Sequence, residues 1–344
     1  MKKLICILSI LAGLLACNQQ QVGYSGEDLT EKVTIMRNKD LNEPKLMLDV
    51  VGKWKLYEGK SVGSIDISKP ILQGEGKGEL VLPESSLYRS YFQLVTSNGS
   101  TILAERLLPM KGGYNFRDLG GIKTSDGKYI KWGEVFRTGD WAHLTADDLR
   151  YLHSLGLVSI VDFRTEEERI QEPSKVIDSA KVYNFTIAPG NLSISSLSEL
   201  ISLQKEQLDT IMMDLNRELL SDQMSIKQYQ EFFALLQNQA SLPLAFHCSA
   251  GKDRTGMAAA LFLFALGVDE ESVLNDYMQS RVFLADKYKK YVDQYPNLEP
   301  LLTVKPEYLQ SGISYMKKEY GTVESYLEDV LGVDLVRMRE MYLY

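Results

Sequence analysis

The residues best suited to chemistry lie together in residues 247–256, HCSAGKDRTG. Cys248 offers a thiol that can act as a nucleophile. Arg254 offers a planar, permanently charged fork that fits two oxygens of a phosphate. Thr255 can donate a hydrogen bond to the sulfur when the sulfur acts as a leaving group. These residue types predict nucleophilic attack on a phosphate ester.

Two apolar stretches beside this segment predict the elements that position it. Residues 242–246 are short, apolar and opened by a proline, which predicts a buried strand. Residues 257–266 are alanine-rich and too long for one strand, which predicts a buried helix that ends at Gly267. A loop that leads into a helix N-terminus points several backbone N–H groups into one concavity and forms an anion site. The same N–H groups stabilise a thiolate at its mouth.

Two other interpretations of this segment have less support. A single cysteine is often a small hydrophobe of the core. A nucleotide-binding loop needs a serine or threonine directly after its lysine, but Asp253 follows Lys252 here, and the upstream glycine is also missing. The strand, the loop, the Arg-Thr pair and the helix together favour a reactive cysteine.

The HCSAGKDRTG segment resembles the signature loop of the cysteine-dependent phosphatases. Its GKDRTG part resembles the version in bacterial protein-tyrosine phosphatases that are related to phosphoinositide phosphatases. Residues 115–121, NFRDLGG, resemble the opening of the same family. The resemblance implies a phosphatase for phosphotyrosine, with phosphoserine and phosphothreonine as further substrates. The alternative is a phosphoinositide or inositol-phosphate phosphatase, because Lys252 adds charge for a multiply phosphorylated ring.

The expected mechanism has two steps. Cys248 attacks phosphorus and forms a cysteinyl-phosphate, which water then hydrolyses, while Arg254 and the loop amides hold the phosphate oxygens. A carboxylic acid must protonate the leaving group, and two candidates stay open. Asp253 in the loop is slightly favoured over Asp162 at a neighbouring strand end. The loop residues expected to bind substrate are Ser249, Ala250, Gly251, Lys252 and Thr255.

Three further residues are expected to support the loop. His247 should order it by hydrogen bonding, and Arg117 and Asp118 of the NFRDLGG motif should form a structural ion pair beneath it. No cofactor or metal is expected, because His143, His153 and His247 lack the spacing of metal ligands. A non-catalytic phosphate-binding lipoprotein and a sulfur-transfer enzyme are competing functions. The intact loop, with its arginine spacing, argues against both.

The N-terminus resembles a bacterial lipoprotein signal. Two lysines precede an apolar stretch, residues 4–15, that is too short to span a bilayer, and Leu-Leu-Ala precedes Cys17. We expect residues 1–16 to be removed, Cys17 to be acylated and residues 17–28 to form a tether. This predicts an exported lipoprotein, anchored to a membrane on its periplasmic or cell-surface side. An ordinary cleaved secretory peptide is the alternative.

Cysteine usage and charge fit this expectation. Of the three cysteines, Cys6 would leave with the signal and Cys17 would carry lipid, so Cys248 would be the free thiol of the mature protein. Loss of the two signal lysines leaves 36 of 38 basic residues against 46 acidic ones, and the net charge changes from −8 to about −10. That charge argues against nucleic acid as a partner. The expected partners are a phosphorylated protein or phosphoinositide, and a membrane through the lipid.

The first part of the mature chain predicts an accessory domain of β-strands. Residues 29–108 hold short alternating segments separated by turns, with Asn98-Gly99 as a strong hairpin signal. About seven strands in roughly eighty residues predict a small immunoglobulin-like β-sandwich that acts as a spacer or binding module. The expected strands are 33–37, 45–48, 54–58, 64–67, 78–82, 88–95 and 100–106.

In residues 109–344 strands alternate with helices. With the resemblance, this predicts an α/β cysteine-phosphatase fold with a central, mostly parallel sheet flanked by helices. Ligands of such sheets bind beyond the carboxyl ends of the strands, so Asp162 and Cys248 should converge there. The expected strands are 157–164, 181–186 and 242–246, and the helices between them begin after Thr145 and at Glu166.

The remaining segments are expected to be helical. Residues 195–220 carry one apolar stripe and form either a covering helix, which we favour, or a lid over the site. Lys287, Lys289 and Lys290 form either a solvated face, which we favour, or a basic rim for phosphorylated ligands. Ser225 should cap the next helix. Further helices are expected at 270–291, 306–320, 323–331 and from 334 onward.

Overall fold

The computed structural model describes residues 22–38, 43–188 and 197–344. The expected signal peptide, the acylated Cys17 and the first residues of the tether lie outside the described residues. The beginning of the expected helix at 195–220 also lies outside them. We call the residues up to Leu108 the N-terminal part and those that follow the C-terminal part.

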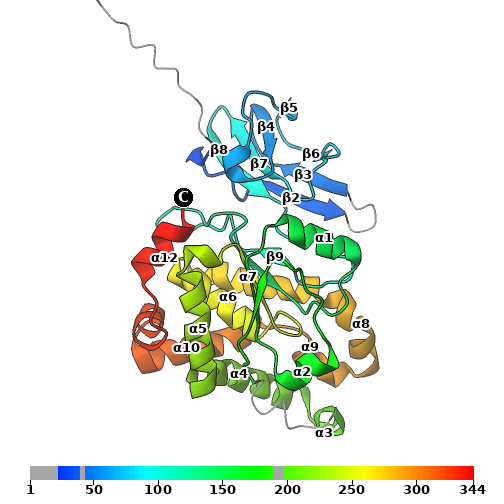
Figure 1. Ribbon diagram of the computed structural model, residues 1–344, viewed down its shortest axis with the longest axis vertical. Helices are drawn as coiled ribbons and strands as arrows, with labels where there is room; N and C mark the ends of the chain where they lie inside the picture. Colours follow the sequence, from blue (N-terminus) through cyan, green and yellow to red (C-terminus); the bar gives the residue numbers. More distant parts are fainter. Residues whose placement is uncertain (1–21, 39–42, 189–196) are drawn as a thin grey trace, which may run out of the picture.

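The N-terminal part, at the top of Figure 1, consists of β-strands. They form two antiparallel sheets, one with the order β1-β8-β7-β4-β5 and one with the order β2-β3-β6. Leu46, Leu56 and Leu94 come from different strands and are completely buried in one core between the sheets. The described strands are β1 Ser25–Gly26, β2 Val33–Asn38, β3 Glu43–Leu48, β4 Lys53–Gly59, β5 Leu72–Glu75, β6 Gly78–Val81, β7 Tyr91–Thr96 and β8 Gly99–Ala104.

Most of the expected strands of this part are present, but two details differ. Residues 64–67 form no strand, and a short 3-10 helix, Val62–Ser64, stands at their start. Strand β5 was not among the expected strands, and it runs through Gly74. A Cβ on Gly74 would lie 2.6 Å from the Trp54 ring, so this glycine makes room for an aromatic ring on the neighbouring strand. The hairpin between β7 and β8, which Asn98 indicated, is confirmed.

The C-terminal part contains a sheet with the order β12-β11-β13-β10-β9. Strands β12, β11, β13 and β10 run parallel, and the short β9 pairs antiparallel with β10 at the edge. In the middle strand, His247 lies in register between Asp162 on one side and Thr138 on the other. The three strands therefore end at one edge of the sheet. The described strands are β9 Arg117–Asp118, β10 Val135–Thr138, β11 Ser159–Asp162, β12 Lys181–Asn184 and β13 Leu244–His247.

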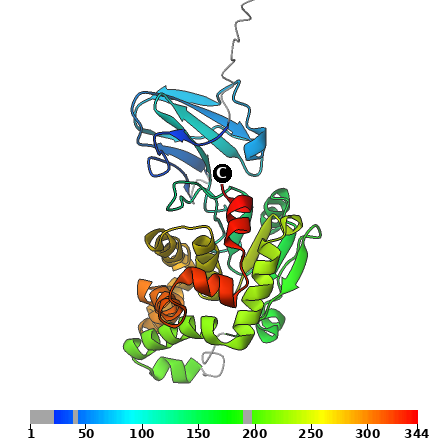
Figure 2. The same ribbon diagram turned by 90° about the vertical axis from the view of Figure 1, so that its left-hand side faces the viewer.

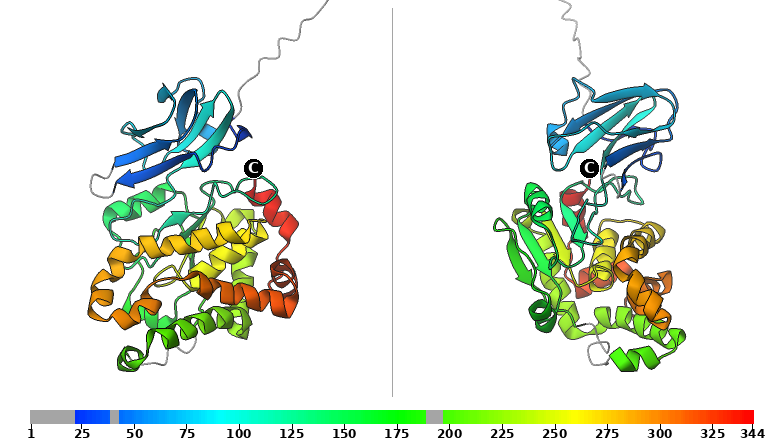
Figure 3. Two further views of the ribbon diagram at one scale, coloured as in Figure 1. Left: turned by 180° about the vertical axis from the view of Figure 1, so that it is seen from behind. Right: turned by 90° about the vertical axis from the view of Figure 1, so that its right-hand side faces the viewer.

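Helices cover both faces of this sheet (Figure 3). Successive strand residues point to opposite faces. Ile160 and Ala245 pack with side chains of α1 on one face, whereas Val161 and Phe246 pack with α5 and α6 on the other. Helix α6 is buried along its whole length, which explains why its sequence has no polar face. These helices are α1 Ala146–Ser154, α5 Gln223–Leu236 and α6 Arg254–Ala265.

The other helices differ from expectation at three points. Asp222, and not Ser225, caps α5, because Asp222 Oδ2 accepts a hydrogen bond from the Ser225 N–H at 2.8 Å. The expected helix at 270–291 is divided at Leu284, and the one before α5 is divided at Gln204. The described helices are α2 Glu166–Gln171, α3 Leu197–Ser202, α4 Lys205–Ser221, α7 Glu270–Phe283, α8 Ala285–Gln294, α9 Glu299–Leu302, α10 Pro306–Tyr320, α11 Val323–Ser325 with a following π-helical turn Tyr326–Val330, and α12 Leu335–Tyr342.

The two parts meet along a buried seam. Trp132 of the C-terminal part is 8% exposed and packs in one cluster with Tyr57, Tyr91 and Ile102 of the N-terminal part. Its Nε1 donates a hydrogen bond to the carbonyl oxygen of Ile102 at 3.3 Å. The chain also ends at this seam (Figure 2). There the hydroxyl of Tyr344 accepts a hydrogen bond from the Trp132 N–H. Within the described ranges, no helix combines the length and the apolar character needed to cross a bilayer.

Candidate active site

Cys248 lies directly after β13 and opens a loop that leads into α6. All residues of β13 are buried, and Cys248 itself is 2% exposed. Helix α6 begins at Arg254, with Asp253 as its N-cap residue. The strand, the loop and the helix thus follow one another as the sequence predicts. We call residues 248–253 the Cys248 loop.

Gly251 gives this loop its bend. Its φ is +69°, which lies in the left-handed region that favours glycine. A Cβ at this position would lie 2.3 Å from the carbonyl oxygen of Thr138, the last residue of β10. The loop therefore lies so close to the end of β10 that a side chain at its bend does not fit.

Two side chains bind the carbonyl groups of the loop from outside. Asn115 Nδ2 donates hydrogen bonds to the carbonyl oxygens of Gly251 at 2.9 Å and Ala250 at 3.3 Å. Arg137 Nη2 donates to the same Gly251 oxygen at 2.8 Å. The N–H group of a trans peptide points away from its C=O group. The N–H groups of these peptide bonds therefore point away from Asn115 and Arg137, as an anion-binding concavity requires.

Beneath the loop, two arginines share one carboxylate. Arg117 Nε lies 3.3 Å from one oxygen of Asp276 on α7, and Arg137 Nη1 lies 2.6 Å from the other. Burial would raise the pKa of Asp276, but the two guanidinium groups hold it at about 2. Burial and the charge of Arg137 lower the pKa of Arg117. No role was predicted from the sequence for Asn115, Arg137 or Asp276.

The expected ion pair between Arg117 and Asp118 is wrong. Neighbouring residues of a strand point to opposite faces, and these two residues form β9. Arg117 lies on the side of the Cys248 loop and also donates a hydrogen bond to Asn115 Oδ1. Asp118 lies toward the N-terminal part, where its Oδ2 is 2.6 Å from Arg89 Nη2. Arg117 therefore supports the loop directly, and Asp118 does not.

Arg254 is held by Glu168, which the sequence analysis did not single out. Its Nη1 and Nη2 each lie 2.7 Å from one oxygen of that carboxylate. Ser249 Oγ also donates a hydrogen bond to Glu168. Burial would raise the pKa of Glu168, but the guanidinium and the hydroxyl hold it at about 2. The fork of Arg254 is thereby fixed at the N-terminus of α6.

Glu168 belongs to a capping box that is visible in the sequence. Its N–H donates to Thr165 Oγ1 at 3.2 Å, and its Oε2 accepts from the Thr165 N–H at 2.8 Å. Thr-x-x-Glu at the start of a helix is the signature of this cap. Because β11 ends beside β13, the signature could have placed a carboxylate near the Cys248 loop.

Asp162 and His247 lie side by side on the face of the sheet that α1 covers. The ring of His247 stacks on Trp141 with 6.0 Å between ring centres, and its Nε2 lies 3.7 Å from Asp162 Oδ2. Asp162 accepts hydrogen bonds from Arg164 Nε at 3.0 Å and Nη2 at 2.8 Å. Burial would raise the pKa of Asp162, but His247 and Arg164 lower it. The Asp162 carboxylate therefore forms a buried ion pair with Arg164.

Asp253 is more accessible than Asp162, with 19% of its side chain exposed. It makes no side-chain cap to α6, and Lys252 Nζ lies 3.0 and 2.8 Å from its two oxygens. Lys252 is buried, so Asp253 already balances its charge. Burial, and after it the charges of Asp253 and Cys248, raise the pKa of Tyr288 on α8. Asp253 and Cys248 therefore lie near the same tyrosine.

Thr255 carries a hydroxyl that is completely buried in the first turn of α6. Among the described residues, its Oγ1 has no hydrogen-bond partner. Buried polar atoms of native proteins are nearly always hydrogen-bonded. This hydroxyl is therefore available for the role that the sequence suggested, donation to a sulfur that leaves.

Asp140 and Lys287 form an ion pair at the edge of the Cys248 loop. Asp140 Oδ2 lies 2.9 Å from Lys287 Nζ. The Asp140 N–H donates to the carbonyl oxygen of Ser249 at 3.2 Å, and Lys287 Nζ lies 3.5 Å from the same oxygen. The ammonium group also lies 5.6 and 5.7 Å from the ring centres of Tyr114 and Tyr288. Of the three lysines that the sequence grouped, Lys287 is the one that contacts the loop in the described part of the chain.

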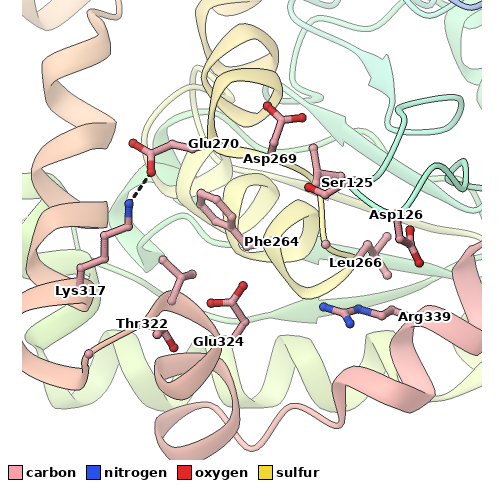
Figure 4. A pocket seen from close by; sticks show the side chains of 14 residues that line it. Ser125, Asp126, Phe264, Leu266, Asp269, Glu270, Lys317, Thr322, Glu324 and Arg339 are labelled. Atoms are coloured by element: carbon pink, nitrogen blue, oxygen red, sulfur yellow. Dashed lines mark hydrogen bonds and ion pairs between the residues drawn. The ribbon is translucent and has the colours of Figure 1, made fainter.

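A cavity of about 500 Å³ lies elsewhere, between the end of α6, α10 and α12 (Figure 4). Its lining includes Arg339 and the ion pair of Lys317 with Glu270, but none of the residues of the Cys248 loop. It is therefore not part of the candidate active site. In the ranges that the structure describes, no group of three or more histidine, cysteine, aspartate or glutamate side chains is placed to hold a metal ion.

Comparison with known proteins shows which family the C-terminal part resembles. The model of the tyrosine phosphatase family matches residues 108–344. A Cupriavidus necator protein named as a tyrosine-protein phosphatase is 32% identical over 242 residues, which are 67% of this chain and 85% of the relative. The triple specificity protein phosphatase PtpB of Mycobacterium tuberculosis is 25% identical over 269 residues, which are 66% of this chain and 94% of the relative.

Solved structures add little to this comparison. The P. aeruginosa protein TpbA, in complex with pTyr, covers 62% of this chain and 88% of its own, at 12% identity and a TM-score of 0.25. That likeness is too slight to bear on the fold. The family model and the 32% identical relative, by contrast, each span about two thirds of the chain. The chain belongs to the tyrosine phosphatase family.

Proposed function

We propose that this protein hydrolyses phosphotyrosine through a cysteinyl-phosphate on Cys248. The observation that carries the proposal is the shape of the Cys248 loop. Asn115 and Arg137 bind its carbonyl groups from behind, and Glu168 fixes the fork of Arg254 at the start of α6. This arrangement supports an anion site in front of a buried nucleophile. Membership in the tyrosine phosphatase family supports the same activity.

The proposed reaction transfers the phosphoryl group twice. In the first step the sulfur of Cys248 bonds to phosphorus, the bond to the leaving oxygen breaks, and that oxygen takes a proton from an acid. Arg254 and the loop N–H groups stabilise the charge on the other phosphate oxygens. In the second step water attacks phosphorus and gives a proton to the carboxylate left by the acid. The sulfur leaves as a thiolate, to which Thr255 donates a hydrogen bond. The products are an alcohol or phenol and inorganic phosphate.

A comparison of substrates tests this function. The chain from residue 18 onward should release phosphate from p-nitrophenyl phosphate and from a phosphotyrosine peptide. Cys248→Ser should release none, because a hydroxyl at this position is a far weaker nucleophile. Equal phosphate release by the wild type and the variant on every phosphate ester would refute the proposal.

We assign the acid to Asp253 and not to Asp162. An acid must reach the leaving oxygen, and Asp162 is 2% exposed, with its carboxylate bound by Arg164 and close to His247. Asp253 lies in the loop, is partly exposed, and makes no cap to α6. Its carboxyl group can therefore reach a leaving oxygen.

The choice of acid is testable with two substrates and two variants. Asp253→Asn should slow phenyl phosphate, whose leaving group is poor, by roughly 10²- to 10⁴-fold and should lose the alkaline limb of its pH–rate profile. It should slow p-nitrophenyl phosphate much less, because that leaving group needs little protonation. Asp162→Asn should affect both substrates equally. The reverse pattern would assign the acid to Asp162.

A phosphoinositide or inositol phosphate is the second candidate substrate, and Lys287 favours it. The ammonium group of Lys287 lies at the edge of the loop, where a further phosphate of the same ring could exchange for Asp140. Lys252 does not add to this argument, because Asp253 already balances its charge. Lys287→Met should raise KM for a phosphoinositide at least tenfold more than KM for p-nitrophenyl phosphate. Equal changes would favour the phosphotyrosine peptide as substrate.

We further propose that the protein is a lipoprotein held at a membrane by acylated Cys17. The support is the sequence alone, namely a short apolar stretch that ends in Leu-Leu-Ala before the cysteine. Cys17→Ser should move the protein from the membrane fraction to the soluble fraction of its cells. An unchanged distribution would exclude this anchor.

Two proposals about architecture accompany the function. The N-terminal part, residues 29–108, is proposed to be an immunoglobulin-like domain, which its two antiparallel sheets over one core support. The C-terminal part, residues 109–344, is proposed to have the cysteine-phosphatase fold. The parallel strands around β13 and the helices on both faces support it.

A further inference from the structure

Arg89 of the N-terminal part is a buried cation at the seam, between β6 and β7. Its Nη2 lies 2.6 Å from Asp118 Oδ2, and its Nη1 donates to the carbonyl oxygen of Glu105 at 2.9 Å and to the hydroxyl of Tyr151 at 3.5 Å. Its Nε donates to the hydroxyl of Tyr91 at 3.1 Å. The side chains of Arg89 and Asp118 are 3% and 0% exposed. The guanidinium group is thus bound on all sides.

Asp118 also binds the backbone of the C-terminal part. Besides Arg89, its carboxylate accepts hydrogen bonds from the N–H groups of Gly120 at 2.8 Å and Gly133 at 2.9 Å. Asp118 is one of the two residues of β9, a short edge strand that pairs with β10 and, through a single bridge from Arg117 to Leu107, with the N-terminal part. The position of so short a strand depends on the contacts of its side chains.

The other residue of β9 leads directly to the Cys248 loop. Arg117 faces away from Arg89 and binds Asp276 at 3.3 Å. In register beside it on β10, Arg137 binds the same carboxylate and donates to the carbonyl oxygen of Gly251. A chain of direct contacts therefore joins the N-terminal part to the bend of the loop.

We propose that Arg89 is a positioning residue for the Cys248 loop, so that the N-terminal part belongs to the catalytic unit. The proposal rests on the function proposed for Cys248. Buried ion pairs add little net stability, but they can specify one geometry. Without Arg89 the buried Asp118 carboxylate loses the cation that contacts it directly, and β9 must shift to relieve it. Arg117 and Arg137 would move with β9, and the loop would lose the support of its bend.

A purely structural contact at the seam is the competing explanation. The seam offers a matched control, because Lys123 of the C-terminal part pairs with Asp28 of the N-terminal part at its exposed rim. Both pairs join the same two parts. Arg89 is linked to β9, whereas Lys123 is remote from it in the contacts described.

The experiment compares Arg89→Met and Lys123→Met in the chain from residue 18 onward. Two quantities are measured: kcat for p-nitrophenyl phosphate, and the rate at which iodoacetate alkylates Cys248 at neutral pH. Arg89→Met should lower kcat by roughly 10- to 100-fold, as displacements far from the chemistry can do. It should also slow alkylation, and Arg89→Lys should recover part of both. Lys123→Met should leave both within twofold of the wild type.

A double variant guards against misfolding. Arg89→Met with Asp118→Asn removes both charges of the pair, so that no ionised group is left buried alone. It should fold, with an unchanged circular dichroism spectrum, and should still show slow turnover and slow alkylation. Wild-type kcat and alkylation in a folded single or double variant would overturn the proposal. A wild type without phosphatase activity would refute the proposed function instead, and the alkylation rates would still test the role of Arg89.

Discussion

The bend of the Cys248 loop depends on a residue without a side chain. Gly251 combines a φ of +69° with a carbonyl oxygen 2.3 Å from the place of its Cβ. The first feature alone costs an L-residue roughly 1 to 2 kcal/mol. The second requires Thr138 or the loop to move, and either movement displaces the N–H groups that face the substrate.

Gly251→Ala should therefore lower kcat at least tenfold, with a moderate loss of stability. Gly127→Ala is the matched control, because Gly127 has a φ of +87° and no atom within 4 Å of its Cβ position. Gly127→Ala should lose about as much unfolding free energy as the φ of Gly251→Ala costs, and its kcat should be unchanged. Steady-state rates and urea unfolding of both variants measure the difference. Full activity of Gly251→Ala would contradict the close packing.

The carboxylate of Glu168 makes stability depend on pH. Its pKa is about 2 in the folded protein and 4.5 in an unperturbed chain, because Arg254 and Ser249 bind the charged form despite burial. A depressed pKa contributes stability that is complete above pH 4.5 and is lost as the pH falls toward 2. The contribution is roughly 2 to 3 kcal/mol, with allowance for the part of the side chain that is exposed.

Glu168→Gln tests this contribution. In urea unfolding, wild type should exceed the variant in stability at pH 6, and the difference should shrink toward pH 2.5. Glu167→Gln on the exposed side of the same helix should behave like the wild type. A difference between Glu168→Gln and wild type that is the same at both pH values would show that the carboxylate does not act through its charge.

Some residues of the candidate site could be predicted from the sequence and others could not. Cys248 and Arg254 lie in one loop, so their spacing alone indicates the chemistry. Asn115, Arg137 and Asp276 come from distant segments and meet only because β10, β13 and α7 pack together. The NFRDLGG motif marked the segment of Asn115, but no local pattern distinguishes Arg137 and Asp276 from surface charges.

At the scale of elements, two helices begin with the same capping box but in different places. Thr145 and Asp148 cap α1, and Thr165 and Glu168 cap α2. Such a cap stabilises a helix by about 1 kcal/mol. In α2 the acidic member also holds Arg254, so that the cap links the start of this helix to the site.

Thr165→Ala should lower both stability and activity, whereas Thr145→Ala should lower stability alone. Each should cost about 1 kcal/mol of unfolding free energy, because one hydrogen bond to a helix N–H group is lost. Thr165→Ala should also lower kcat several-fold, since the N-terminus of α2 no longer fixes Glu168. Thermal unfolding and initial rates on p-nitrophenyl phosphate measure both effects. Equal activity of the two variants would show that the cap of α2 does not position Glu168 for the reaction.

Elements with strong local signals were predictable, and those set by tertiary contacts were not. The alanine-rich stretch and Gly267 predicted α6 because propensity and burial agree there. The ion pair expected between Arg117 and Asp118 failed because strand geometry separates neighbours, and β9 was not recognised as a strand. Strand β5 was missed because its Gly74 leaves space for the ring of Trp54 on the neighbouring strand. Composition does not show such a contact.

At the scale of the whole molecule, the two parts share buried side chains. Arg106 lies over the ring of Trp132 at 5.0 Å, and Tyr24 stacks on Tyr129 with 3.8 Å between ring centres. Trp132 packs with residues of the N-terminal strands and not with the core of its own part. The sequence indicated two parts, but it could not show a shared core, because Trp132 looks like any aromatic residue near a turn. The seam suggests that the parts unfold together.

Thermal unfolding should thus show one transition in the wild type and two in Trp132→Ala. Replacing a buried tryptophan by alanine costs about 3 to 5 kcal/mol, and at this position the loss falls on the contact between the parts. Trp141→Ala removes a buried indole from within the C-terminal part, so it should lower the temperature of a single joint transition. Differential scanning calorimetry distinguishes the two patterns. One unchanged transition in Trp132→Ala would mean that other contacts, with Arg89 and Asp118 foremost, hold the parts together without the aromatic cluster.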